Sequence, residues 1–213
     1  GFRSRFAYQN VMFIASGLVV EAVSGKPWPK FVEERILKPL QMNNSSTNLN
    51  DFQNSPDISI PHFEGKPRAF INFDNSGPAG AINSSIEDML KWLLMWIKNG
   101  EVDGRQFLSV RTIRRILSSQ MFTSVGPGTG PMGTHFVNYG YGWHLMDYAG
   151  RKIIFHGGAL PCYLSQVTFV PEEELGIVVL IVALGTGMRR GEILSLRWEN
   201  VDLVRGIITI TNS

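Results

Sequence analysis

The fold is decided by residues 141–183, YGWHLMDYAGRKIIFHGGALPCYLSQVTFVPEEELGIVVLIVA. Runs rich in β-branched and aromatic residues alternate there with short turns that contain glycine, proline or acidic residues. They predict four strands, at residues 141–147, 152–156, 163–170 and 175–183. The connections are too short to hold crossover helices, so we expect an antiparallel meander.

Upstream of this meander the apolar spacing changes to that of helices, at residues 7–24, 28–40, 85–98 and 109–118. The first predicted helix has one face expected to be buried, and Gly25 is placed to end it; the residues of that face are Val11, Ile14, Leu18, Val19 and Ala22. Helices followed by strands predict an α+β domain.

Residues 43–80 are rich in Asn, Ser, Pro and Gly, with isolated aromatic residues between them. Aromatic side chains in such a stretch indicate docking, so we expect a long ordered loop or lid. After it, Ser85-Ile86-Glu87-Asp88 has the form of a capping box, which opens the helix at 85–98.

Composition narrows the classes of function. With 213 residues, 44% of them apolar and 18% charged, the chain suits one sizeable globular domain. A net charge of +2 without a run of like charges argues against a nucleic-acid partner. The longest apolar run, Leu175 to Leu184, has only strand length, so no membrane span is expected. Cys162 is the single cysteine, which excludes an intrachain disulfide.

Several short motifs follow one another in a fixed order. Tyr8-Gln9-Asn10 comes first, and it is followed by Pro78-Ala79-Gly80, Ser84 to Trp92, Tyr141-Gly142-Trp143 and His156-Gly157-Gly158. In this order they resemble the motifs of the serine β-lactamase and penicillin-binding-protein family, in particular class C β-lactamases, family VIII esterases and D-aminopeptidases. The resemblance covers about residues 1–182. It implies a β-lactamase/transpeptidase-like fold, an antiparallel sheet flanked by helices with a helical region.

The nucleophile motif of that family, Ser-x-x-Lys, is absent from the sequence. No serine has a lysine three residues on: Ser24 is followed there by Pro27, Ser85 by Asp88 and Ser165 by Thr168. We therefore expect an N-terminally truncated domain. Gly1 stands where a methionine would open a gene product, and no apolar signal segment follows it, so we expect further sequence upstream and leave the localisation open.

The resemblance assigns roles to five residues. Tyr8 would share with the missing lysine the task of taking the proton from the serine, and a phenol with a pKa of about 10 needs a nearby cation for that. Asn10 would turn its amide toward the acyl-side carbonyl of the substrate. His156 stands where β-lactamases often carry lysine and would hold a substrate carboxylate or tune the tyrosine. Gly157 and Gly158 would leave a strand edge bare for an extended substrate.

Function follows from the resemblance as a hypothesis with competitors. The chain would be a serine hydrolase that acts on an ester, β-lactam or D-peptide amide through an acyl-enzyme, without cofactor or metal, and inactive here because Ser-x-x-Lys is missing. The first alternative is a non-enzymatic fragment, chimeric or completed by a partner. Taken alone, Tyr8 and Asn10 also suit a ring at the edge of the core and a surface amide, and His156 suits a turn at a strand end.

The tail, residues 183–213, does not fit this family. Thr186-Gly187-Met188-Arg189 with Glu192 resembles the Thr-Gly-x-Arg-x-x-Glu segment of tyrosine recombinases (phage integrases), in which Arg189 would contact the scissile phosphate. The later recombinase motifs are absent, so a remnant of a DNA strand-exchange enzyme is only the second alternative. We favour a helix at 188–198 and a strand at 206–211 packed on the domain. The run Gly185-x-Gly187 lacks the third glycine at dinucleotide-loop spacing, so no nucleotide cofactor is expected.

A truncated sheet has consequences for partners. Loss of N-terminal strands would expose an edge of the antiparallel sheet, and exposed edges pair with other chains. We therefore expect a homo-oligomer that forms through this edge, besides a small ester, β-lactam or D-peptide as substrate.

Overall fold

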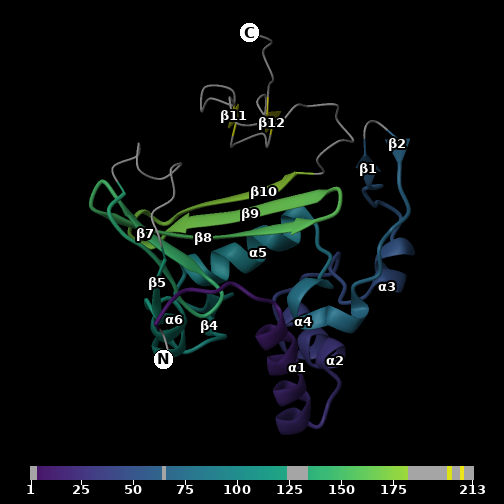
Figure 1. Cartoon of the computed structure of the whole chain (residues 1–213), viewed down its shortest axis with the longest axis horizontal. Coiled ribbons are helices and arrows are strands. Elements are labelled where there is room, and N and C mark those ends of the chain that lie inside the picture. The colour runs from purple at the N-terminus through teal and green to yellow at the C-terminus, as the bar shows by residue number, and fades with distance from the viewer. Residues whose placement is uncertain (1–3, 64–65, 124–133, 182–200, 203–206, 209–213) are drawn as a thin grey trace.

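A six-stranded antiparallel sheet is the centre of the computed structural model, which describes residues 4–63, 66–123, 134–181, 201–202 and 207–208 (Figure 1). The strand order is β10-β9-β8-β7-β6-β5, and each neighbouring pair is antiparallel. The strands are β5 (Met121–Thr123), β6 (Val137–Tyr139), β7 (His144–Tyr148), β8 (Arg151–Leu160), β9 (Tyr163–Val170) and β10 (Leu175–Ile181). The predicted meander is confirmed.

Strand β8 departs most from the prediction. The predicted strand stopped at His156, whereas β8 continues through the two glycines to Leu160. Gly157 lies opposite Gln166 and Gly158 opposite Ser165, so pairing with β9 holds the glycines in the strand. Two strands of this sheet were not predicted, β5 and β6, because three residues each carry too little pattern to be recognised without their neighbours.

Helices precede and flank this sheet, as the α+β prediction requires. They are α1 (Val11–Ser24), α2 (Trp28–Val32) with a π-helical extension (Glu33–Leu37), α3 (Leu49–Gln53), α4 (Gly77–Gly80), α5 (Ile86–Ile97) and α6 (Val110–Ile116). Short 3-10 turns lie at Asp74–Ser76 and Pro171–Glu173. Three two-residue ladders complete the described elements: β1 (His62–Phe63) with β2 (Lys66–Pro67), β3 (Glu101–Val102) with β4 (Arg105–Gln106), and β11 (Val201–Asp202) with β12 (Ile207–Ile208).

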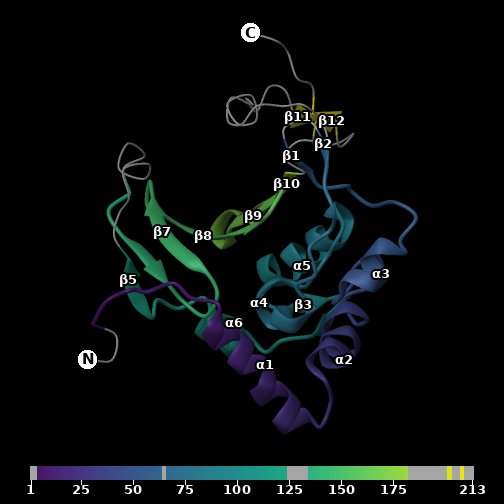
Figure 2. The ribbon, with the colours of Figure 1, turned by 45° about the vertical axis from the view of Figure 1, so that its right-hand side comes forward.

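Helix α5 packs against one face of the sheet over β9 and β10, and the core lies between them (Figures 1 and 2). Leu93 and Ile97 of α5 lie against Gly176 of β10, where an added Cβ would come within 2.6 Å of a Leu93 methyl group. Ile154 and Phe169 fill the same core from β8 and β9. The glycine therefore sets how closely helix and sheet approach.

The start of α5 is capped as the sequence predicts. The Ser85 hydroxyl accepts the Asp88 backbone N–H at 3.3 Å. The Asp88 side chain is fully buried and does not reach back to Ser85; it accepts the Asn44 backbone N–H at 2.7 Å and the Ser45 hydroxyl at 2.8 Å instead. Asp88 thus ties the beginning of the lid to the core helix.

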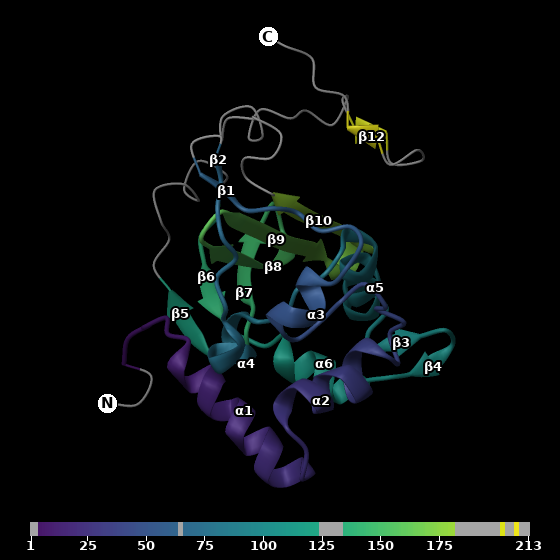
Figure 3. The same cartoon turned by 90° about the vertical axis from the view of Figure 1, so that its right-hand side faces the viewer.

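Helix α1 differs from its prediction. It begins at Val11 rather than at residue 7, and Gly25 ends it in a left-handed conformation, as predicted. The predicted buried face is wrong: Val11, Leu18 and Val19 are 61–65% exposed. The buried residue is Gly17, where a Cβ would lie 2.2 Å from Cγ of Pro78, so α1 meets α4 through a close backbone approach (Figure 3).

The tail is described only at β11 and β12, and β12 falls inside the strand predicted at 206–211. The predicted helix at 188–198, together with Arg189, lies outside the described residues. None of the helices in the described ranges is long and apolar enough to cross a membrane.

Candidate active site

A cleft of about 1100 Å³ brings together three segments that are distant in sequence. Its walls are the segment before α1, the described part of the lid at residues 43–80, and the end of β8 with the turn into β9. All five residues predicted for the site line this cleft: Tyr8, Asn10, His156, Gly157 and Gly158. The two motifs, which the resemblance to a family predicts to converge, therefore lie on one cleft in the structure.

Tyr8 lies just before α1 with its ring half exposed. The centroid of that ring is 6.2 Å from the centroid of His156 and 6.2 Å from that of Tyr139. Asn10 is the N-cap residue of α1, but its side chain makes no capping hydrogen bond, while its carbonyl accepts the Phe13 and Ile14 N–H groups at 3.0 Å. The side-chain amide of Asn10 is therefore not used to cap α1.

The end of β8 forms the opposite wall. Pairing with β7 stops at Phe155, whereas pairing with β9 continues to Leu160. In the described part of the chain, residues 156–160 therefore have a strand partner on one side only. At Gly158 an added Cβ would lie 2.6 Å from the Ser165 hydroxyl oxygen, so glycine lets β9 approach closely. Glycine also leaves the β8 backbone without a covering side chain at this position.

His156 is held by a neighbour that the sequence analysis missed. The Tyr139 hydroxyl lies 3.2 Å from Nε2 of His156. Burial lowers the pKa of His156, against a backbone hydrogen bond with Gly157 that raises it. Burial, and then the nearby Tyr8, raise the pKa of Tyr139 to about 12. Tyr139 stands two residues before the Tyr141-Gly142-Trp143 motif, and this nearness is the only sequence signal that pointed to it.

The lid lines the cleft with apolar side chains and packs against the sheet, as its aromatic residues predict. Phe52 and Phe70 meet edge to face with centroids 5.6 Å apart. The Tyr163 hydroxyl of β9 donates to the Ser59 carbonyl at 2.7 Å and so fastens the lid to the sheet. Among the described lining residues, Arg68 and Asp74 carry formal charge, and Asp74 is engaged by the Leu49 backbone N–H at 3.0 Å.

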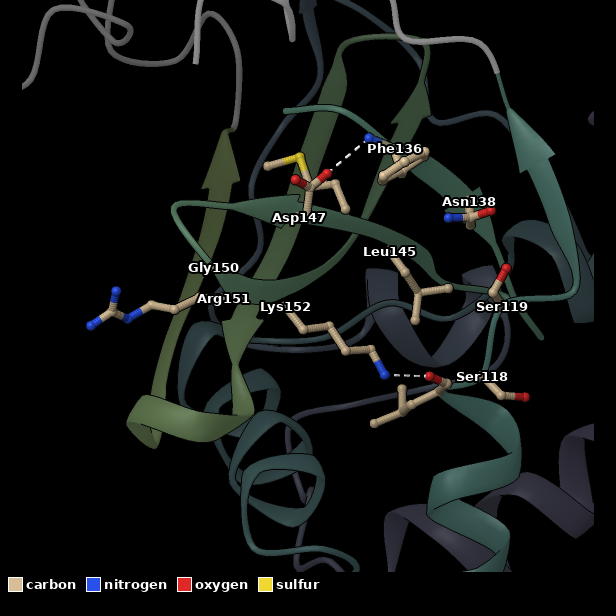
Figure 4. Close-up of a pocket in the computed structure, with 11 residues that line it drawn as sticks. Ser118, Ser119, Phe136, Asn138, Leu145, Asp147, Gly150, Arg151 and Lys152 are labelled. Carbon is tan, nitrogen blue, oxygen red and sulfur yellow. Dashed lines mark hydrogen bonds between the residues drawn. The ribbon is translucent and has the colours of Figure 1, made fainter. Parts of the chain in front are cut away.

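A second, smaller hollow of about 440 Å³ lies over β6, β7 and β8 beside the end of α6 (Figure 4). Two of its charged side chains, Asp147 and Lys152, make hydrogen bonds to the backbone that stabilise the fold. Asp147 accepts the backbone N–H of Phe136 at 2.8 Å, and Lys152 donates to the Leu117 carbonyl at 2.6 Å (Figure 4). Asp147 also accepts the His135 backbone N–H at 3.0 Å. The larger cleft is therefore the better candidate. No group of three or more His, Cys, Asp or Glu side chains suited to a metal ion occurs in the described ranges.

Comparison with known proteins identifies the family. A family model described as beta-lactamase matches residues 2–199. The chain belongs to the β-lactamase family. Similar proteins include the unguisins hydrolase ungD' of Aspergillus campestris, 27% identical over 185 residues, which are 83% of this chain and 33% of that protein. A D-aminopeptidase of Cereibacter sphaeroides is 27% identical over 180 residues, 82% of this chain and 31% of that protein.

Solved structures share the β-lactamase-like fold. The octameric penicillin-binding protein homologue from Pyrococcus abyssi superposes with a TM-score of 0.73 at 24% identity, over 90% of this chain and 41% of that chain. The D-amino acid amidase from Ochrobactrum anthropi gives 0.62 at 17% identity, over 84% and 55%. The predicted β-lactamase/transpeptidase-like fold is confirmed, and the chain spans about a third of the length of the curated relatives above.

The family match also bears on the tail, because it runs to residue 199 and so includes Arg189. The resemblance of this segment to recombinases stays a prediction, as does a domain boundary at residue 182.

Proposed function

We propose that this chain forms the substrate cleft of a serine hydrolase that cleaves an ester, β-lactam or D-peptide amide through an acyl-enzyme. The observation that carries the proposal is the convergence of Tyr8, Asn10 and the open end of β8 on one cleft. Membership of the β-lactamase family supports the reaction class, and the D-aminopeptidase and D-amino acid amidase relatives support amides of D-residues among the substrates.

Each group has a chemical task in this proposal. The Tyr8 phenol takes part in removing the proton from the attacking serine. The Asn10 amide holds the acyl-side carbonyl, because one short side chain offers both a donor and an acceptor. The edge of β8 at Gly157 and Gly158 pairs with the substrate backbone as an added strand, and a strand N–H there stabilises the oxyanion.

The 213 residues alone should bind substrate without turning it over. Ser59, Ser84 and Ser165 line the cleft, yet none has a lysine three residues on. Without a base beside it, a serine hydroxyl is a weak nucleophile. The nucleophile has to come from outside these residues for the reaction to proceed, and in its absence the chain acts as a binding fragment.

Association with a partner is part of this proposal. In the described ranges β10 pairs with β9 on one side and with no strand on the other. Its residues Leu175, Ile177 and Val179 carry no charge that would deter pairing. Light scattering should therefore give a mass of at least twice 23.8 kDa, and the mass of one chain would contradict the edge pairing.

The experiment that tests the proposed function measures covalent labelling and reversible binding separately. Intact-protein mass spectrometry after incubation with a fluorophosphonate, and separately with a penicillin, should show no adduct. Titration with N-acetyl-D-phenylalaninamide should change the tryptophan fluorescence, because Trp92 and Trp143 line the cleft. Asn10→Ala should weaken this binding about tenfold, the effect of one lost hydrogen bond.

Asn138→Ala is the matched control, because Asn138 lies on β6 in the smaller hollow. It should bind as the unaltered chain does. Equal weakening in both variants, or no saturable binding by a folded chain, would remove the substrate cleft from consideration. A stoichiometric adduct that Tyr8→Phe abolishes would instead show that an unconventional nucleophile completes the site.

A further inference from the structure

The contact between Tyr139 and His156 decides what the β8 wall of the cleft presents to a ligand. The hydroxyl of Tyr139 and Nε2 of His156 are 3.2 Å apart, within hydrogen-bond reach. Tyr139 lies on β6, two strands away from β8, so its ring reaches past β7 to make this contact. Tyr139 is itself packed, with its ring 5.4 Å from Phe6 and 4.7 Å from His144, centroid to centroid.

Among the described residues, none of the rings packed around His156 is a cation. Besides Tyr139 they are Tyr8 at 6.2 Å and His144 at 5.7 Å, centroid to centroid. Burial, and then the nearness of His156, lower the pKa of His144, so this second imidazole is also neutral at pH 7. Among the described residues these rings form an aromatic cluster without a cation, and two of its members, Tyr8 and His156, line the cleft.

The protons in this contact can be placed. A phenol whose pKa is raised to about 12 keeps its proton at neutral pH, so Tyr139 has an O–H to donate. An imidazole whose pKa is lowered by burial is neutral, and only an unprotonated Nε2 can accept that O–H. The ring proton is then on Nδ1. A backbone hydrogen bond with Gly157 raises the pKa of His156, as a bond donated by the ring would.

We propose that Tyr139 is a positioning residue that fixes His156 as a neutral imidazole with its proton on Nδ1, and that the β8 wall therefore accepts an uncharged ester or amide in preference to a carboxylate. A carboxylate placed against this wall would lose its hydration without a cation among these rings, because the lining cation Arg68 belongs to the lid. The preference for uncharged ligands rests on the proposed function, because it takes the cleft to be the substrate site. The tautomer does not rest on it.

Nuclear magnetic resonance tests the tautomer without any ligand. Long-range ¹H–¹⁵N correlation on protein with ¹⁵N-labelled histidine distinguishes a protonated Nδ1 from a protonated Nε2, and His156→Gln assigns the signals. At pH 7.5 we expect His156 to be neutral with its proton on Nδ1, although free histidine favours Nε2. Tyr139→Phe should move the proton toward Nε2.

Tyr141→Phe is the matched control, because Tyr141 is exposed and no hydrogen bond of its hydroxyl occurs among those of the described residues. It should leave the His156 signals unchanged, and amide spectra of both variants establish that they are folded. An imidazolium, or a proton on Nε2 in the unaltered chain, would overturn the proposal before any variant is examined. An unchanged tautomer in folded Tyr139→Phe would overturn the role of Tyr139.

A pair of ligands that differ only in charge tests the preference. N-acetyl-D-phenylalaninamide should bind about fivefold or more tightly than N-acetyl-D-phenylalanine at pH 7.5, and Tyr139→Phe should narrow the gap because it frees a ring N–H for the carboxylate. Equal affinities in the unaltered chain would overturn the preference. Should neither ligand bind, the proposed function and the preference fail together, while the tautomer measurement still decides the role of Tyr139.

Discussion

Helices α5 and α1 are both strongly apolar, yet they differ in how many apolar side chains they bury. Helix α5 begins at a capped serine and buries Leu93, Met95, Trp96 and Ile97. Helix α1 has no side-chain cap, buries only Gly17, and exposes apolar side chains along its length. One helix is held by a side-chain core. The other is held by the close approach of Gly17 to Pro78 and by its contact with α2, where the Glu21 carboxylate accepts the Trp28 backbone N–H at 2.8 Å.

This difference extends to the candidate site. His156 and its glycines belong to the sheet that α5 packs against, whereas Tyr8 and Asn10 belong to the segment that α1 anchors. Stability is not uniform across a protein, and an element with few buried contacts opens more readily than the core. We therefore expect the two halves of the cleft to respond differently to substitution.

The largest effect is expected where α5 meets the lid. Asp88→Ala should lower the free energy of unfolding by about 3 kcal/mol, because the buried carboxylate accepts hydrogen bonds from Asn44 and Ser45 that would lose their partner. Denaturant unfolding measures the loss. Glu87→Ala, an exposed change in the same helical turn, should cost less than about 1 kcal/mol. Equal losses would mean that the buried carboxylate does not secure α5.

A smaller effect is expected where α1 meets α4. Alanine is the better helix former by about 1 kcal/mol, yet at Gly17 its Cβ would overlap the Pro78 ring, and overpacking costs about 1–3 kcal/mol. Gly17→Ala should therefore destabilise the chain by about 1 kcal/mol, and hydrogen exchange should quicken in α1 but not in α5.

Val23→Ala supplies the control for α1. Its side chain is 83% exposed, so the unfolding free energy should change by less than about 0.5 kcal/mol. A more stable Gly17→Ala chain would show that α1 is free to move away from Pro78, and the contrast between the two helices would then be greater than the structure implies.

Sequence patterns predicted best the features that local chemistry fixes. Strand β9 has the predicted bounds 163–170, Ser85 caps α5, and Gly25 ends α1. Turn residues and capping side chains make hydrogen bonds within a few residues of themselves, so the local sequence is enough to predict them. The prediction that Tyr8 and His156 converge came from the resemblance to a family, because no local sequence rule connects residues so far apart.

Features that depend on distant partners were missed or misjudged. The apolar spacing of α1 predicted a buried face, but its buried contact is with a proline some sixty residues later, through a glycine that hydrophobic spacing ignores. Tyr139 had no motif of its own, because its importance arises only when β6 and β8 join the same sheet. Burial of a helix face and the partner of a histidine are properties of the assembled fold.

Acid should act on a third region, near the end of β7. Hydrogen bonds from the Phe136 backbone and the His135 side chain lower the pKa of Asp147 to about 2 from its usual 3.8. A carboxyl whose folded-state pKa is depressed contributes stability above its unfolded-state pKa, and this contribution is lost as the pH falls through the folded-state value. Unfolding experiments should show this loss between about pH 4 and pH 2.

Asp147→Asn should remove this part of the pH dependence and leave the remaining acid sensitivity in place. Phe122→Leu, an exposed change on β5, which β6 separates from β7, should keep the dependence of the unaltered chain. An acid profile unaltered by Asp147→Asn would mean that the carboxylate is equally well bonded in the unfolded chain.

The smallest effect is expected from the ion pair at the end of α5. Lys98 and Glu174 lie 3.0 Å apart, and their side chains are 52% and 67% exposed. Water screens such a pair, so a double-mutant cycle with Lys98→Gln and Glu174→Gln should give a coupling below about 0.5 kcal/mol. A coupling above about 1 kcal/mol would mean that the ion pair at the end of α5 attaches this helix to the sheet together with the apolar core. A negligible coupling would leave the packing of Leu93 and Ile97 on Gly176 as the attachment that α1 lacks, because no side chain of α1 enters a core of that kind.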